Sequence, residues 1–317
     1  MSAVRKILFG VFCIVTFSFC EELKGYIGVA AGYYEQQDNF EDHSINHTIY
    51  SLDTKPKDFS RYLALPSMDL NYYDFYFKTV FKDDFGVQAG YYFADGSSIF
   101  VLQNGFGISQ EFEEQSFSYK LKQIKDDMYI NPYLTNTNRA KKEATTNVLE
   151  LKVEDIMDFI EIKYKYENIN IDDELNNDAK QSGDKHDFST MAYVIPFASI
   201  GFGGFGLYGG LGNFDGDSND YTKYGYKYAM QMQIAKKHQF QMELATSKYD
   251  FDTQNSYFNQ IRDEKETLMK LIYMQESFLD RSDLFLNFIF VKQSLDSNID
   301  FFDKDMKAVL FNIGSSF

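Results

Sequence analysis

Charged side chains recur at every second position in several segments of this chain. Between residues 159 and 168, Glu161, Lys163 and Lys165 alternate with isoleucine and tyrosine. Alternate residues of a β-strand point to the same face, so such a segment presents a row of mixed charge on one side. Ammonium and carboxylate groups on the wall of an aqueous passage either select solutes or pair with each other and brace the wall. The residues expected to line such a passage are Lys120, Lys122, Glu150, Lys152, Glu161, Lys163, Lys165, Lys223, Lys227, Glu243, Glu266 and Lys270.

The glycines Gly201, Gly203 and Gly206 form a G-x-G-x-x-G pattern. A dinucleotide site needs this pattern at a turn from a strand into a helix. Here residues 207–210 are Leu-Tyr-Gly-Gly, which continues a strand and does not begin a helix. We therefore predict no cofactor site, because glycines in a strand also mark bulges and close packing of neighbouring residues.

Histidine is scarce, and His43, His47, His186 and His238 all fall in segments expected to connect strands. A hydrolase with a histidine-activated nucleophile needs that histidine held beside a serine or aspartate. No expected strand carries one, so the sequence favours no enzyme activity.

The acidic segment 213–220 contains Asp215, Asp217 and Asp220 and resembles a calcium-binding loop. The helical calcium motif requires a glutamate at its twelfth position, where this chain has Tyr226. We therefore predict no defined metal site. Two interpretations stay open: a hydrated acidic loop, or weak divalent-cation binding that bridges to lipopolysaccharide phosphates.

The composition indicates which elements position the charged rows. Phe and Tyr make up the whole aromatic content of 18%, and the chain has only four prolines. Aromatic residues favour strands and proline interrupts them. After residue 20 no run approaches the roughly 20 apolar residues of a spanning helix. Segments of about ten residues that alternate apolar and polar are typical of outer-membrane strands, with one face toward lipid and one toward a polar lumen.

The alternation predicts a single-domain, closed antiparallel transmembrane β-barrel of about fourteen strands, or twelve if two hairpins fold outside the membrane. Connectors are alternately long and short, which puts the long ones outside the cell and both termini in the periplasm. Loops 35–66 and 124–144 are long enough to fold inward. The expected strands are 25–34, 67–81, 85–93, 98–109, 115–123, 145–153, 159–168, 188–196, 199–212, 221–234, 239–248, 265–275, 284–292 and 306–317.

The N-terminus predicts export. Two basic residues precede an apolar stretch that ends at Cys20, the pattern of a secretory signal peptide over residues 1–20 with cleavage before Glu21. Lipidation of Cys20 is the alternative, and bulky Phe19 disfavours it. Both cysteines of the chain lie inside this segment, so residues 21–317, the expected barrel domain, contain no thiol. This excludes a disulfide framework and a thiolate metal site.

The C-terminus carries a stripe of apolar residues on one strand face, formed by Val309, Phe311, Ile313 and the terminal Phe317. It resembles the signal by which the barrel-insertion machinery recognises outer-membrane barrels. The formal net charge of −16 argues against nucleic-acid binding. The expected partners are therefore outer-membrane lipid, lipopolysaccharide and the insertion machinery of a Gram-negative bacterium, and the sequence indicates no oligomeric state.

Residues 128–174 resemble an uncharacterised family of outer-membrane β-barrel proteins from Proteobacteria. The similarity rests on Asn131-Pro132-Tyr133, on Arg139, on the hairpin 147–168 and on the acidic tail 171–173. The family pattern prefers aspartate where Asn131 stands. The resemblance implies a barrel fold and an outer-membrane location, and it implies no activity or substrate.

Three functions fit these patterns. The first is a passive, porin-like channel for small hydrophilic solutes, supported by the charged rows. The second is a non-conducting structural or surface barrel whose acidic loops bind cations or lipopolysaccharide. The third is transport of hydrophobic compounds, which the mixed apolar faces of 98–109 and 284–292 leave open.

Overall fold

The computed structural model describes residues 23–41, 44–80, 86–102, 105–112, 117–156, 159–174, 180–196 and 200–317. The predicted signal peptide and its cleavage site lie outside these residues. No helix in the described part of the chain is long and apolar enough to cross a membrane.

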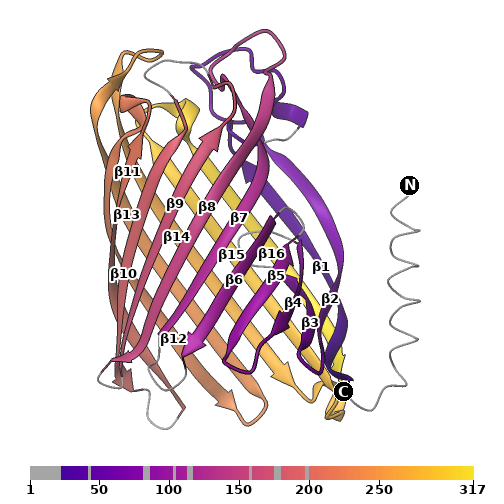
Figure 1. Cartoon of the computed structure of the whole chain (residues 1–317). Helices are drawn as coiled ribbons and strands as arrows, with labels where there is room; N and C mark the ends of the chain where they lie inside the picture. Colours follow the sequence, from indigo (N-terminus) through magenta and orange to yellow (C-terminus); the bar gives the residue numbers. More distant parts are fainter. Residues whose placement is uncertain are drawn as a thin grey trace, which may run out of the picture.

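Sixteen strands of the described residues form one closed antiparallel barrel, in which each strand pairs with its neighbours along the chain and β1 pairs with β16 (Figure 1). The strands are β1 (Leu23–Gln37), β2 (Phe59–Tyr72), β3 (Phe75–Val80), β4 (Gly86–Tyr92), β5 (Ser97–Leu102), β6 (Gly105–Phe112), β7 (Phe117–Tyr129), β8 (Lys141–Ile156), β9 (Ile160–Ile171), β10 (Gly183–Pro196), β11 (Gly201–Phe214), β12 (Tyr221–Ala235), β13 (His238–Asn255), β14 (Gln260–Glu276), β15 (Leu284–Ser297) and β16 (Lys304–Ser316). Short 3-10 helices lie at η1 (Ser44–Asn46), η3 (Asp217–Asn219), η4 (Phe278–Asp280) and η5 (Asp300–Phe302).

The first and last strands close the barrel. The backbone amide of Phe317 donates to the carbonyl of Gly25 at 3.0 Å, and the amide of Gly25 donates to the carbonyl of Phe317 at 3.1 Å. The C-terminus therefore lies beside the start of β1, at the lower end of the barrel in Figure 1. Val309, Phe311 and Ile313 lie on the outer face of β16, while the intervening Leu310 and Asn312 face inward and are buried. Recognition of this stripe by an insertion machinery stays a prediction.

The strand count is higher than the predicted fourteen, because two expected strands are each a hairpin. The segment 67–81 turns back at Tyr73 and Asp74, where Tyr73 has a φ of 51°. Left-handed backbone normally selects glycine or asparagine, so a tyrosine there hides the turn from a sequence reading. The segment 98–109 likewise divides into β5 and β6.

The extra turn also reverses the direction of the strands that follow it. β4 runs toward the end of the barrel that carries the short turns. The connection 94–97, which the sequence pattern places among the long loops, therefore lies at the short-turn end, and that assignment is wrong. β2 also begins at Phe59, inside the expected loop 35–66.

The two faces of the barrel differ in chemistry. Large apolar side chains on the outer face are exposed, among them Val29 at 62%, Leu207 at 68% and Phe311 at 50%. Alternate residues on the same strands point into the barrel. An apolar outer belt around a polar interior is the arrangement of a membrane-spanning barrel, because lipid satisfies the outer face and hydrogen bonds between strands satisfy the backbone.

The wall is uneven in height. β8, β13 and β14 contain 16, 18 and 17 residues, whereas β3, β4, β5 and β6 contain 6, 7, 6 and 8. In Figure 1 these four short strands occupy only the lower part of the barrel.

Candidate functional site

The inner faces of β7, β8 and β9 form one wall of mixed charge. The Lys122 ammonium lies 2.6 Å from a Glu150 carboxylate oxygen. On β9 the Lys163 ammonium lies 2.6 Å from Glu161, and Lys152 of β8 reaches the same glutamate at 3.5 Å. The pairs of Lys122 with Glu150 and of Lys152 with Glu161 join neighbouring strands diagonally, whereas Glu161 and Lys163 are alternate residues of β9. Glu150 therefore points inward, as the alternation predicts.

A second part of the inner wall is organised around Glu266 of β14. Its carboxylate lies 3.0 Å from the Lys223 ammonium of β12. It also accepts hydrogen bonds from the Tyr249 hydroxyl at 2.9 Å, the Ser247 hydroxyl at 3.1 Å and the Gln293 amide at 2.6 Å. Side chains from four neighbouring strands, β12 to β15, thus meet at the Glu266 carboxylate. The ion pair and the hydrogen bonds offset the free-energy cost of placing this charge on the inner wall.

Two cavities occupy the interior. The larger has a volume of about 1360 Å³, and the smaller, of about 660 Å³, lies toward the short-turn end. Glu243 lines both cavities. The predicted residues that line one or both cavities are Lys120, Glu150, Lys152, Glu161, Lys163, Lys165, Lys223, Lys227, Glu243, Glu266 and Lys270. Lys122, the remaining one, pairs with Glu150 beside the larger cavity. Their role in passage of a solute is a proposal developed below.

Loops cover the upper end of the barrel with an aromatic cluster, which we call the cap: Phe40, Ile49, Leu52, Tyr133, Tyr257, Phe258, Ile299, Phe301 and Phe302. The rings of Tyr133 and Tyr257 stack at 4.3 Å, and Tyr133 lies 5.5 Å from Phe301. Tyr133 follows β7 and Phe301 follows β15, which are eight strands apart in a ring of sixteen. Their contact therefore spans the mouth, and parts of loops 35–66 and 124–144 fold inward.

A buried arginine fastens two of these loops. Arg139 is 4% exposed and donates from Nε to the carbonyl of Asn46 at 2.8 Å and from Nη1 to the carbonyl of Pro132 at 2.9 Å. Its guanidinium lies 3.9 Å from the centre of the Tyr129 ring. Burial lowers the pKa of Arg139 from its ordinary value, against a smaller opposing effect of Tyr129. Asn131 accepts a hydrogen bond from the amide of Tyr133 at 3.0 Å, so the short motifs 131–133 and Arg139 build the cap.

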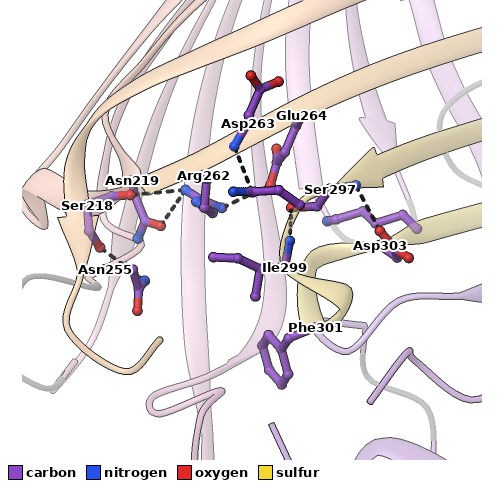
Figure 2. A network of polar contacts seen from close by, with 12 residues as sticks. Ser218, Asn219, Asn255, Arg262, Asp263, Glu264, Ser297, Ile299, Phe301 and Asp303 are labelled. Atoms are coloured by element: carbon purple, nitrogen blue, oxygen red, sulfur yellow. Dashed lines mark hydrogen bonds and ion pairs between the residues drawn. The ribbon is translucent and has the colours of Figure 1, made fainter. Parts of the chain in front are cut away.

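A polar network ties the cap to the wall, and Figure 2 shows Arg262 of β14 at its centre. Arg262 donates to the Asn219 side chain at 2.9 Å and to the carbonyl of Ser218 at 3.2 Å. It also lies 3.4 Å from Glu264 and 4.3 Å from the Phe302 ring centre. Arg262 thus hydrogen-bonds to η3 and contacts the cap through the Phe302 ring.

Other tethers come from the acidic loops. The Lys55 ammonium lies 2.7 Å from Asp303, and this hydrogen bond raises the pKa of Lys55.

Asp220, in the segment that resembles a calcium loop, accepts a hydrogen bond from the amide of Phe214 at 2.6 Å. Within the described residues no group of three or more His, Cys, Asp or Glu side chains is placed to hold a metal ion.

The histidines that the structure describes in strands face away from the lumen. His186 lies in β10, where a loop was expected, and its Nδ1 is 2.8 Å from the Tyr164 hydroxyl. The neighbouring Lys185 and Asp187 point inward, so His186 points outward. His238 begins β13 and lies 2.7 Å from the Tyr273 hydroxyl.

Sequence reasoning missed the cap residues Phe301 and Phe302, and also Asn46 and Arg262, which bond near the cap. The adjacent phenylalanines in the acidic segment 293–305 were the one available signal, since large apolar residues are unusual in a solvated loop.

Closed topology, an apolar outer face and a charged interior define the class of this protein as a membrane-spanning β-barrel with a polar lumen. The chain belongs to the family described as "Protein of unknown function (DUF2860)", which matches residues 23–191 and 210–315. This confirms the resemblance to an uncharacterised barrel family. A search of curated proteins finds no match.

Several solved barrels are similar over most of the chain. A BenF-like porin from Pseudomonas fluorescens Pf-5 has 8% identity and a TM-score of 0.43, over 94% of this chain and all of the other. The outer membrane protein opdK from Pseudomonas aeruginosa has 9% identity and a TM-score of 0.45 at coverages of 94% and 100%. For OprD from the same organism the identity is 10%, the TM-score 0.45 and the coverages 94% and 95%.

Proposed function

We propose that this protein is an outer-membrane channel that passes small hydrophilic solutes through its polar lumen. The observation that carries the proposal is the pair of interior cavities, both lined in part by lysine and glutamate side chains. The location rests on the barrel fold together with the signal peptide predicted over residues 1–20, since closed antiparallel barrels with short turns and long loops are the outer-membrane architecture.

The charges act mainly by pairing. Lys122 of β7 pairs with Glu150 of β8, Lys163 pairs with Glu161 along β9, and Lys223 of β12 pairs with Glu266 of β14 across β13. These pairs leave a hydrated surface of nearly balanced charge. Such a surface admits ions of both signs and discriminates weakly between them. The cap narrows the mouth, so we expect a small conductance.

Conductance in a planar lipid bilayer tests the proposal. The purified protein should give steady current steps, and the double substitution Lys163→Glu with Lys165→Glu should shift the reversal potential in a salt gradient toward cation selectivity. Ile162→Leu, on the outer face of the same strand, is the matched control and should leave the selectivity unchanged. Absence of current above background would contradict the proposal and favour a structural or surface barrel.

Transport of hydrophobic compounds is the second candidate, and one observation favours it. The four neighbouring strands β3 to β6 contain only 6 to 8 residues, which is too few to span a membrane. On that side of the barrel the lumen therefore lies close to lipid.

A further inference from the structure

Three charged side chains of the lumen wall have no ion pair or hydrogen bond in the part of the chain that the structure describes: Lys227, Glu243 and Lys270. Charges close to them differ, since Lys163 and Lys223 are both held in ion pairs. The three residues lie on the consecutive strands β12, β13 and β14. A charge that no protein group neutralises is open to a charged group of a solute.

The register places Glu243 between the two lysines. Glu243 is the direct partner of Lys270 on β14, and Lys227 of β12 is the partner of Ala245, two residues further along β13. Opposite charges at directly opposed positions normally attract each other into contact. Here Lys270 lines only the smaller cavity, Lys227 lines only the larger, and Glu243 lines both. The carboxylate therefore has an ammonium group on its extracellular side and another on its periplasmic side.

Gly206 of β11 lets the Lys227 side chain extend away from Glu243. The two residues are register partners on neighbouring strands. A Cβ at Gly206 would lie 2.9 Å from the Lys227 Cε, 2.9 Å from the Met191 Sδ and 2.2 Å from the carbonyl oxygen of Thr190. The lysine stem therefore crosses β11 over the glycine, on the side opposite to β13.

The charges around Lys227 leave its ammonium group available. The charged groups whose fields act on it are Lys163, Glu243 and Glu161. Glu161 already contacts Lys163 at 2.6 Å and Lys152 at 3.5 Å. Glu243 is thus the one carboxylate of this set that no described residue pairs.

The smaller cavity supplies room and neutral contacts. Its volume of about 660 Å³ lies within the range of small-molecule sites, roughly 300–1,000 Å³. Gln231, Gln241 and Tyr193 line it with uncharged polar groups. Its other two carboxylates, Glu154 and Glu161, are paired with lysines of β8 and β9.

The three charges together match one kind of solute. A simple anion is repelled by Glu243, and a simple cation is repelled by both lysines. A solute with an ammonium group and a carboxylate fits both signs, because its ammonium group reaches Glu243 while its carboxylate reaches Lys227 or Lys270.

We propose that Lys227, Glu243 and Lys270 form a binding site for small zwitterionic solutes of the amino-acid type on the path through the barrel. The ammonium group of the solute binds Glu243, and its carboxylate binds first Lys227 in the larger cavity and then Lys270 in the smaller one. This substrate class rests on the proposed channel function, because the site lies inside the lumen.

Entry of two isomers into proteoliposomes tests the site. Alanine and lactamide contain the same atoms, but at pH 7 only alanine carries an ammonium group and a carboxylate. An ion pair between hydrated groups is worth roughly a fivefold change in affinity. Alanine at low concentration should therefore enter several-fold faster than lactamide, once the rates of protein-free liposomes are subtracted. Equal rates for the wild type would overturn the site.

Substitutions locate the preference. Glu243→Gln should bring the two rates close together, and an unchanged preference would overturn the assignment to these residues. Glu111→Gln, which removes a carboxylate of β6 from the larger cavity, is the matched control and should keep the preference. Lys270→Gln repeats the comparison if Glu243→Gln fails to give a heat-modifiable barrel.

Competition tests the need for both charges. Serine should slow alanine entry several-fold more strongly than equal concentrations of propionate or isopropylamine, which carry one charge each. Stronger competition by propionate would indicate an anion site and by isopropylamine a cation site, and either result would overturn the proposal.

Binding without passage separates this site from the channel. Saturation-transfer NMR on the detergent-solubilised barrel detects bound alanine whether or not the protein conducts. A signal that Glu243→Gln abolishes, in a protein that admits neither isomer, would support the site and contradict the channel. Entry of both isomers at equal rates would support the channel and contradict the site.

Discussion

Loosening the cap should open the channel, and Tyr133→Ala is the sharpest way to do it. Tyr133 is 4% exposed, and its ring lies 4.3 Å from that of Tyr257, 5.5 Å from Phe301 and 5.9 Å from Phe258. Removing a buried aromatic side chain costs about 3–5 kcal/mol. Because the ring belongs to a loop, we expect this cost to fall on the closed cap and to spare the barrel wall.

The magnitude translates into channel opening. Each 1.4 kcal/mol is about a factor of ten in an equilibrium constant, so a loss of about 3 kcal/mol raises the ratio of open to closed cap by roughly 100-fold. Single-channel recording should show longer or larger open states for Tyr133→Ala, and Tyr133→Phe should resemble the wild type. Tyr226→Ala, which removes an exposed outer-face ring, is the control. The conductance of Tyr226→Ala should equal that of the wild type. The reasoning is wrong if the conductance of Tyr133→Ala also equals that of the wild type.

Three further substitutions test other parts of the account. In the same salt gradient, Lys163→Glu alone should shift the reversal potential in the same direction as the double variant with Lys165→Glu, but by less. A shift in the opposite direction would contradict a solute path along β9. Gly107→Ala places a Cβ 2.3 Å from the backbone carbonyl oxygen of Leu121 and 2.5 Å from the Phe100 ring, and it should destabilise the barrel by about 1–3 kcal/mol. This is measured as a lower temperature for loss of heat-modifiable migration, and an unchanged temperature would contradict close packing at this position. Phe317→Ala retains the backbone pairing with β1 and should reduce the amount of assembled barrel several-fold on immunoblots, whereas wild-type amounts would exclude the C-terminal ring as an assembly signal.

Much of the barrel was predictable because a wall between lipid and a polar lumen imposes a period of two on the sequence. The segment 159–168 alternates throughout, and it corresponds to β9 over Ile160–Ile171. The prediction fails where a strand rises past the lipid. β10 begins at Gly183, well before the expected residue 188, because residues 183–187 are Gly-Asp-Lys-His-Asp and carry no alternation of apolar and polar side chains.

The short-strand region was the least predictable part of the wall. Tyr73 adopts left-handed backbone without glycine, so the hairpin of β2 and β3 has the sequence appearance of one strand. This error removed one strand from the count, and the segment 98–109, which divides into β5 and β6, removed the other. Together they concealed the low wall formed by β3 to β6.

The cap could not be predicted from local patterns, because its contacts join residues that are far apart in the chain. The side-chain amide of Asn39 donates to the carbonyl of Phe301 at 3.0 Å across a separation of 262 residues. Loop length indicated that inward folding was feasible, but only the closed topology brings the loops after β1, β7, β13 and β15 to one mouth.

Water access on alternate residues of one strand tests the central claim most directly. On β10, Ser189 lines the larger cavity and Thr190, the next residue, points to the outer face. In intact outer membranes, a small impermeant thiol reagent should modify Ser189→Cys and leave Thr190→Cys almost unlabelled. Equal labelling of the two positions, or faster labelling at 190, would show that water does not fill the interior while lipid covers the outside.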